Sequence, residues 1–275
     1  MNRTISREAI DLMRPDSKLG ILATTDGEGY PHLSFISSIQ ALGDDRINFG
    51  QFCTGLSKDH VKQRPDVAFL VVSPDMRWLR GNARYDHAEN TGPVFDEYNN
   101  KPLFRYNCYC GFNTVHFLDL SGISDIGRLP MGKIVAGALL SRLGAPFCTR
   151  NEKSILTRTG KGLFSKLDGL KFIGWHNEGG QLEILPIIQA GPAGTDRVVF
   201  SRLPYGRELK AIPRGAGCAI LGMNLEMQSV LAKGVLSRSG SLLNVLDIER
   251  VYNSMPPKAG YIYPREKRPV ALTSF

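Results

Sequence analysis

The sequence of 275 residues lacks any long apolar run. A membrane-spanning helix requires about eighteen or more predominantly apolar residues in succession, and no segment approaches that length. The N-terminal segment, MNRTISREAIDLMRPD, is charged and has no signal-peptide core. We therefore expect a cytoplasmic protein with no membrane partner.

Cysteine is scarce, and the five thiols are odd in number and scattered, at Cys53, Cys108, Cys110, Cys148 and Cys218. An odd, scattered set suits a reducing compartment better than a disulfide framework. Cys108 and Cys110 are too close together for a zinc spacing, and no second pair accompanies them. The five histidines show neither HxxxH nor HExxH spacing. We expect no metal site built by the protein.

Acidic residues are outnumbered, 26 against 34 basic ones, which gives a formal charge of +8. The basic residues are spread along the chain among acidic ones, and only the tail PREKRP clusters them. A distributed excess of this kind is typical of a solvated surface that attracts anionic ligands. It predicts no nucleic-acid partner, and it suits a small anionic molecule.

A repeat is present at a fixed offset, because Leu19 set against Leu170 (170 − 19 = 151) aligns two long segments. LGILATTDGEGYPHLSFISSIQALGDDRINFG then lies over LKFIGWHNEGGQLEILPIIQAGPAGTDRVVFS. Turns, apolar runs and glycines keep register over about fifty residues, and a two-residue slip then matches Gly81 with Gly234. The alternative is that two unrelated β-meanders share the same rhythm. We favour two copies of one domain.

Each copy predicts the same series of elements. A helix comes first, beginning at Ser6 in copy one and at Asn151 in copy two, since both residues suit an N-cap. Strands follow over 19–25 and 30–41, then a short strand RINFG, a helix over about 57–64 and strands over 67–73 and 76–87. Pro65 ends the second helix. Strands this short predict a small closed or half-open barrel.

The predicted fold class is therefore mainly β (α+β), with two tandem barrels and short helices. We expect the first barrel over 1–92 and the second over 151–275. The segment 93–150 has no visible counterpart in copy two, so we expect it to be ordered, either extending the sheet or forming a lid. The C-terminal segment LLNVLDIERVYNSMPP is expected to be a last strand or helix of copy two.

A candidate phosphate site lies at the start of the second helix of copy one. A helix N-terminus presents unpaired N–H groups and a partial positive charge, which attract phosphate. Ser57 and Lys58 add a hydroxyl donor and an ammonium there, Thr54 offers a further donor, and Gly55 lets the backbone approach closely. The alternative interpretation is that Ser57 is an ordinary N-cap and Lys58 a solvated residue.

Three segments together resemble a known family: GYPHLSFISSI, INFGQFCTGLSKDHVKQRPDVAFLVV and RWLRGNARYD. Over about residues 17–90 they are similar to the FMN-binding split barrel of pyridoxamine-5′-phosphate-oxidase-like proteins. The resemblance implies a Greek-key barrel, an FMN at a barrel–barrel interface and a homodimer. It also implies FMN contacts from His32, Leu33, Ser34, Gly50, Gln51, Thr54, Ser57, Lys58, Arg77 and Trp78. For Trp78, packing in a core or interface is the alternative.

The sequence also departs from that family. The flavin-edge strand often carries a cation, usually arginine, where this chain has His32. The C-terminal Trp and Arg set for pyridoxal phosphate has no match in PREKRPVALTSF, so the resemblance does not imply pyridoxamine-phosphate oxidation itself. The CGF motif of the segment 93–150 is faintly similar to haem-utilisation members. A flavin- or haem-binding protein for storage, sensing or delivery, with His116 as a candidate haem ligand, is thus the alternative function. A barrel without cofactor, serving in assembly, is a third.

Copy two lacks the candidate site. At the offset of 151, copy two has Glu183 at the position of His32, Tyr205 at that of Thr54, Glu208 at that of Ser57 and Leu209 at that of Lys58. Carboxylates repel a phosphate, so we expect copy two to cover the flavin rather than bind one. The alternative is that Arg207 and Lys210 restore anion binding there. The leading hypothesis is an FMN-dependent oxidoreductase with no evident catalytic side chain. The sequence leaves open whether FMN lies between the two copies or between two chains.

The remaining aromatic and histidine residues have plainer interpretations. His60, in the helix after the phosphate loop, is expected at the surface. Trp175 and His176 end a strand of copy two and are expected to pack rather than to bind a ligand.

Overall fold

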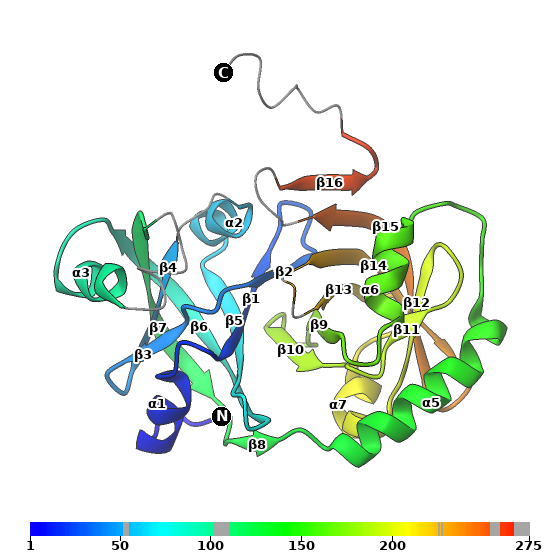
Figure 1. The fold of residues 1–275 in the computed structure, drawn as a ribbon, viewed down its shortest axis with the longest axis horizontal. Coiled ribbons are helices and arrows are strands. Elements are labelled where there is room, and N and C mark those ends of the chain that lie inside the picture. The colour runs from blue at the N-terminus through cyan, green and yellow to red at the C-terminus, as the bar shows by residue number, and fades with distance from the viewer. Residues whose placement is uncertain (52–54, 102–110, 225, 227, 254–258, 267–275) are drawn as a thin grey trace.

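The structure is a computed structural model that describes residues 1–51, 55–101, 111–224, 226, 228–253 and 259–266 (Figure 1). The first unit holds α1 (Arg7–Met13), β1 (Leu19–Thr25), β2 (Pro31–Phe35), β3 (Gln40–Leu42), β4 (Arg46–Gln51), α2 (Ser57–Gln63), β5 (Asp66–Val72), β6 (Arg77–Glu89), α3 (Pro93–Asn100), β7 (Thr114–Ile123) and β8 (Gly127–Arg128). The second unit holds α5 (Met131–Cys148), α6 (Arg158–Ser165), β9 (Leu170–His176), β10 (Leu182–Pro186), β11 (Gly191–Pro192), β12 (Arg197–Ser201), η1 (Leu203–Tyr205), α7 (Gly206–Ala211), β13 (Gly217–Met223), β14 (Ser229–Ser239), β15 (Leu243–Asn253) and β16 (Gly260–Tyr263).

The two units have the same strand order. The first sheet runs β2-β1-β5-β6-β7-β4-β3 and the second runs β10-β9-β13-β14-β15-β12-β11, with all the recorded pairings antiparallel. In each sheet, strands that are far apart in the sequence pair with each other, such as β1 with β5 and β9 with β13. The predicted fold class, mainly β with two tandem units and short helices, is confirmed.

The pairing register supports the offset of 151 and corrects one part of it. Ile21 pairs with Leu70 in the first sheet, and the residues 151 further on, Phe172 and Leu221, pair in the second. The hairpins β5–β6 and β13–β14 also have equal lengths, so the residue that matches Gly81 is Ala232. The two-residue slip to Gly234 is therefore wrong. Gly234 instead follows a register shift in β14, where a Cβ would collide with the Asp247 carbonyl.

One of the two predicted helix starts is confirmed, and one long predicted strand is divided in two. Ser6 caps α1 and accepts from the Ala9 backbone N–H, as predicted. Asn151 does not cap a helix, because α6 begins at Arg158 behind the N-cap Thr157. The single strand predicted over 30–41 is two strands, β2 and β3. Between them, the Ile36 N–H donates to the Gly20 carbonyl and turns the chain away from β1.

The segment 93–150 contributes to both units. Its strand β7 lies between β6 and β4, the place that β15 takes in the second sheet, so the expectation that this segment has no counterpart does not hold for β7. Its long helix α5 packs against β12 and η1 of the second unit. The expected extension of the sheet is thus present, while the domain boundaries at residues 92 and 150 stay a prediction.

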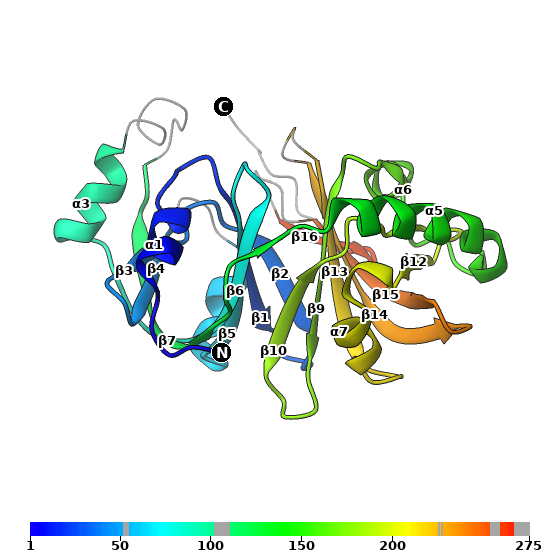
Figure 2. The same cartoon turned by 90° about the horizontal axis from the view of Figure 1, so that it is seen from below.

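The two units lie side by side, with β1, β2 and β5 facing β9, β10 and β13 (Figures 1 and 2). Both contribute to one apolar cluster, in which Leu33 of β2 contacts the backbone at Gly174 of β9 so closely that a Cβ there would overlap it. Thr25 bonds His176, its own equivalent at the offset of 151, at 2.9 Å. Because equivalent residues meet, an approximate two-fold axis runs between them.

We call the contact between β1, β2 and β5 of the first unit and β9, β10 and β13 of the second the seam. A buried ion pair crosses the seam. Lys233 of β14 donates to Asp26 at 2.7 Å, and the side chains are 0% and 7% exposed. Burial alone would raise the pKa of Asp26, but the hydrogen bond and charge of Lys233 outweigh it and hold the pKa below its usual value. The other carboxylate oxygen accepts from the Glu28 and Tyr30 backbone N–H groups. The pair therefore ties the β1–β2 turn to the second unit.

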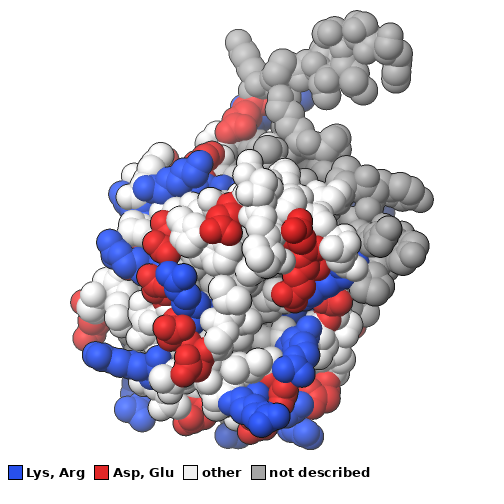
Figure 3. Space-filling view, turned by 90° about the vertical axis from the view of Figure 1, so that its left-hand side faces the viewer, with Lys and Arg blue, Asp and Glu red and all other residues white. Residues whose placement is uncertain are grey.

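The surface carries charges of both signs and one apolar helix face. On the face shown in Figure 3, basic and acidic side chains are interspersed. No helix within the described ranges is long and apolar enough to cross a membrane. The outer face of α5, by contrast, is apolar, with Met131, Val135, Leu139, Leu143 and Phe147 all exposed at every fourth position.

We predict that Asp26→Asn destabilises the protein by about 3 kcal/mol, because it leaves the Lys233 ammonium buried without its counter-charge. Asparagine keeps the oxygen that accepts from the backbone, so the turn itself is preserved. The measurement is urea unfolding of the full chain. Adding Lys233→Met should recover most of the loss, and equal stability of Asp26→Asn and the parent would contradict the prediction.

Candidate functional site

The structure brings Ser34 and Ser57 together where β2 meets α2. β2 is the edge strand of its sheet, and α2 packs against β1 and β2. The hydroxyls of Ser34 and Ser57 hydrogen-bond each other at 2.5 Å, Ser57 is buried, and Lys58 follows it half-buried. The N-cap of α2 is Leu56, without a side-chain cap bond, so the interpretation of Ser57 as an ordinary N-cap is wrong. The Ser57 hydroxyl faces the strand instead.

His32, on β2, lies in a cluster of rings from both units. Its ring is edge-on to His60 of α2 and to Tyr252 of β15, each at 4.9 Å between centroids. His32 is 1% exposed, and its Nδ1 is buried with no hydrogen-bond partner among the described residues. Burial, followed by the charges of Lys233 and His60, lowers the pKa of His32 far below its usual value. The imidazole is neutral at physiological pH.

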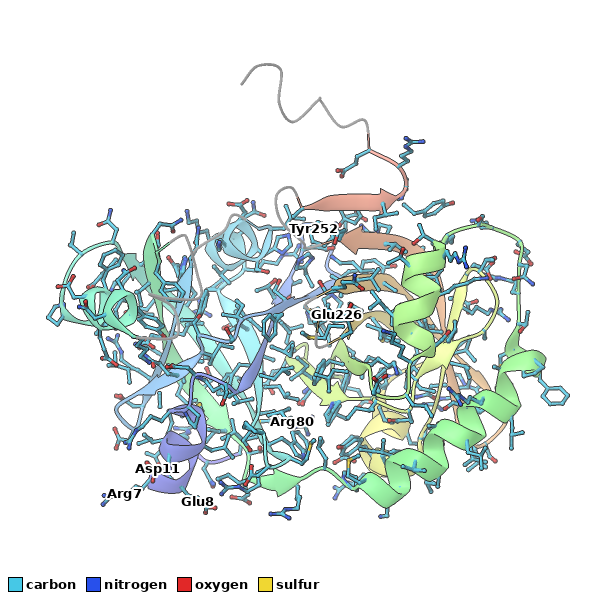
Figure 4. The ribbon with its side chains drawn as sticks, in the orientation of Figure 1. Arg7, Glu8, Asp11, Arg80, Glu226 and Tyr252 are labelled. Carbon is cyan, nitrogen blue, oxygen red and sulfur yellow. The ribbon has the colours of Figure 1, made fainter. Side chains whose placement is uncertain are left out.

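The second unit closes over this position. The Tyr252 hydroxyl is hydrogen-bonded to the backbone of Leu56, at the first turn of α2, and burial raises its pKa to about 12. Tyr261 of β16 stacks edge-on against Tyr252 at 5.4 Å. In Figure 4, Tyr252 and Arg80 lie at the upper and lower ends of the seam between the units. A ligand on β2 and α2 would therefore contact residues of both units.

Gly50 and Gln51 lie at the end of β4, next to the buried His116. His116 was not predicted to lie at the phosphate site. Gln51 Oε1 is 2.8 Å from Nε2 of His116 on β7, and the His116 ring stacks on Phe49. Gly50 bonds the Ser38 hydroxyl through both backbone groups, and a Cβ on it would overlap the Phe112 ring. Burial, then the charges of Lys58 and Lys62, lowers the pKa of His116 to about 4.

The other predicted residues lie elsewhere or are not described. Arg77 forms ion pairs with Asp75 at 2.6 Å and Glu8 at 3.3 Å, so the structure does not bring it to Ser57. Trp78 packs against the second unit, edge-on to Tyr205, which agrees with the packing alternative. Leu33 is fully buried in the seam. Thr54 lies outside the described residues.

The equivalent position in the second unit is filled by its own side chains. Glu183, which stands for His32, is paired with Arg80 at 3.0 Å, both 17% exposed. Leu209 and Tyr205, which stand for Lys58 and Thr54, belong to the apolar core of the second unit. The hydroxyl, ammonium and imidazole set thus occurs on one side of the approximate two-fold axis, and an internal ion pair replaces it on the other.

Sequence reasoning missed several residues of the site. His60 was expected at the surface but is 8% exposed, with Nδ1 3.2 Å from the Thr24 hydroxyl. Its position three residues after Ser57, on the face of a helix that packs on the sheet, was the available signal. Tyr252 and Lys233 come from strands about 200 residues away in the chain, and no local pattern marks them. Trp175 is buried in the core, as expected.

No family model matches the chain, and no curated protein matches it. Several solved structures are similar over less than half of it. An FMN-binding protein from Syntrophomonas wolfei is 18% identical over 42% of this chain and 82% of its own, with a TM-score of 0.37. General Stress Protein 26 from Bacillus anthracis is 16% identical over 44% and 97%, with a TM-score of 0.35. HutZ, a haem storage protein from Vibrio cholerae, is 13% identical over 45% and 96%, with a TM-score of 0.34.

One of these structures is that of an FMN-binding protein, the kind of protein that the sequence resembles. Among the residues that the structure describes, no group of three or more His, Cys, Asp or Glu side chains is placed to hold a metal ion.

We predict that the free energy of unfolding falls by about 2 kcal/mol between pH 7 and pH 5 through His116 alone. Its pKa is about 4 in the folded state and about 6.5 when unfolded, so the unfolded chain takes up the proton first and stability is lost as the pH falls below about 6.5. Buried His32 acts in the same direction. Urea unfolding at the two pH values measures the effect.

His116→Gln should make this pH dependence shallower. His87→Gln is the matched control, because Asp86 raises the pKa of half-exposed His87, so the sign of its contribution to the pH dependence is opposite. An identical slope for the parent and His116→Gln would refute the assignment.

Proposed function

We propose that the chain binds FMN between its two units and acts as an FMN-dependent oxidoreductase. The observation that carries this proposal is the polar set on β2 and α2: two hydroxyls in contact and an adjacent ammonium, at the seam where the second unit closes over them. The absence of this set from the equivalent position in the second unit supports one flavin for each chain. Descent of the units from one duplicated domain is part of the same proposal.

The residues present fit a flavin phosphate. Ser34 and Ser57 supply hydroxyl donors, and Lys58 supplies the charge that a phosphate needs. The buried Nδ1 of His32 has no partner among the described residues, so a ligand atom would satisfy it. Gln51 and the β2 backbone lie within the same region, and Tyr252 would shield the site from water. The flavin supplies the hydride or electron transfer, and the protein supplies anchoring and shape.

The substrate is proposed as a small, anionic molecule, since the chain carries an excess of positive charge. We keep the cytoplasm as the proposed location. Burial keeps His32 and His116 neutral, so neither imidazolium is available as a general acid at neutral pH. Reactions that need only the flavin are therefore favoured.

A non-catalytic flavin-binding protein uses the same site and is the second candidate. Haem ligation by His116 is less favoured by the geometry, because its Nε2 is bonded to Gln51 and its ring lies against Phe49. The visible spectrum of the purified protein distinguishes flavin from haem. Reduction of the bound flavin by a physiological donor, followed by reoxidation on a substrate, distinguishes the enzyme from the carrier.

We predict that Lys58→Ala weakens FMN binding by about tenfold to a hundredfold, as expected for loss of one charge-assisted contact. Glu208→Ala, at the equivalent of Ser57 in the second unit, is the matched control and should leave binding unchanged. Fluorescence quenching of FMN during titration gives both dissociation constants. Equal affinity of Lys58→Ala and the parent would place the flavin phosphate elsewhere.

The sequence resemblance predicts a homodimer. In this structure the second unit of the same chain already covers β2, so a homodimer would need a surface other than the seam. We propose the outer face of α5. Its exposed residues are symmetric about Leu139, so an antiparallel second copy would set Met131 against Phe147 and Val135 against Leu143. Lys133 and Arg142 would then face small residues rather than each other.

We predict that Leu139→Lys converts the dimer to a monomer, since it places two ammonium groups on the two-fold axis. Sedimentation equilibrium measures the mass. Met76→Lys, at another exposed position, should remain dimeric. A monomeric parent protein would contradict the proposed contact.

A further inference from the structure

A pocket with several cationic side chains in its wall lies in the second unit, on the opposite face of α7 from Glu208. It is lined by residues of η1, α7, the loop after α7 and the turn between β14 and β15: Arg202, Leu203, Gly206, Lys210, Arg214, Arg238, Gly240, Ser241 and Leu242. Gly206 and Lys210 are four residues apart on α7 and so share one face of the helix. Glu208 and Ala211 line a separate pocket on the other face, beside Glu183 and Arg80.

Four cationic side chains and no carboxylate line this pocket. None of the four forms an ion pair with an acidic residue in the described part of the chain, although salt bridges are frequent elsewhere. Arg202 is 8% exposed, and its guanidinium bonds a backbone carbonyl, that of Ser241. A buried guanidinium without a counter-charge is costly to the fold, so an anion is the missing partner.

Arg238 is fixed in place and still has a free donor. Its terminal nitrogen donates to the carbonyls of Lys210 and Ile212, at 2.7 and 2.9 Å. Its Nε is buried and has no partner among the described residues. Burial, together with the charges of Arg238 and Arg214, lowers the pKa of Arg202, which agrees with cations held close together. The guanidinium groups of Arg202 and Arg238 are therefore oriented before any ligand arrives.

We propose that this pocket binds the phosphate group of a small phosphorylated molecule. A phosphate monoester carries close to two negative charges and three acceptor oxygens, which suit several guanidinium donors better than a single carboxylate does. Leu203 and Leu242 are 40% and 52% exposed at the edge of the pocket, so they would contact an apolar substituent on the phosphate. The site is distinct from the proposed flavin site, which lies on β2 and α2 of the first unit.

The test is isothermal titration of the full chain with inorganic phosphate and with phenyl phosphate, at ionic strength matched with sodium chloride. We expect saturable binding of both, with phenyl phosphate at least threefold tighter because of the two leucines. Lys210→Gln combined with Arg214→Gln, both at exposed positions, should weaken phosphate binding at least tenfold. Arg207→Gln is the matched control, since Arg207 lies on α7 outside the lining, and it should bind as the parent does.

Arg202→Met supplies a second, independent readout. Because the substitution removes an unpaired buried charge, the melting temperature without phosphate should rise, while the phosphate-dependent rise in melting temperature should disappear. A purely structural Arg202 would give a lower melting temperature instead, which would overturn the proposal.

Two further outcomes would overturn the proposal. Binding of phosphate no stronger than that of chloride would show that the cations hold no specific anion. Loss of phosphate binding in Lys58→Ala, with binding kept in Lys210→Gln/Arg214→Gln, would place the phosphate at the proposed flavin site. Conversely, loss of FMN binding in Lys58→Ala with phosphate still bound separates the two sites.

Discussion

The burial of one face of each sheet against the other is the constraint on which the molecule depends. β1, β2 and β5 present Leu33 and Leu70 to Leu182 and Leu221 of the second unit, and all of these side chains are almost fully buried. Neither sheet could leave this face in water, because the apolar area is large and continuous. The position of β2 next to β14 and β15 follows from this burial, and so does the enclosure of His32.

Among the described residues, two buried polar atoms at the contact between the units have no hydrogen-bond partner, His32 Nδ1 and the Tyr205 hydroxyl. Lys233 reaches Asp26, and its equivalent Asn82 donates to the Leu182 carbonyl on the other side of the two-fold axis. Arg80 closes that other side by pairing with Glu183. Glu183 on one side of the seam is thus paired with Arg80, whereas its equivalent on the other side, His32, keeps a buried Nδ1 without a partner.

Much of the fold follows from local patterns in the sequence. The apolar strand over 19–25 and the cap at Ser6 are local features, and both were predicted. The pairing register of the two sheets also agrees with the offset of 151, because strand length and turn type set the register of a hairpin. The failures have tertiary causes. Asn151 suits an N-cap, but its side chain lies by Gly194 of another turn, and α6 begins at Arg158 instead.

The candidate site was predictable only in part, again because tertiary packing brings distant residues together. Ser57 and Lys58 stand next to each other in the chain, so their pattern was visible. Tyr252 and Lys233 reach β2 through the packing of two sheets, and nothing near them in sequence indicates that contact. Arg77 was placed by resemblance alone, whereas in the structure it pairs with its neighbour Asp75 and, because of the position of α1, with Glu8.

The joining of both units in one chain has a consequence for how the seam responds to dilution and to substitution. A site shared by two separate chains falls apart as the protein is diluted, whereas here the second wall is always present at the concentration that the linking segment imposes. A substitution in a symmetric pair of chains is also made twice. In this chain the second unit has Glu208 at the position equivalent to Ser57, while the first unit keeps Ser57. Each side of the seam can therefore change independently.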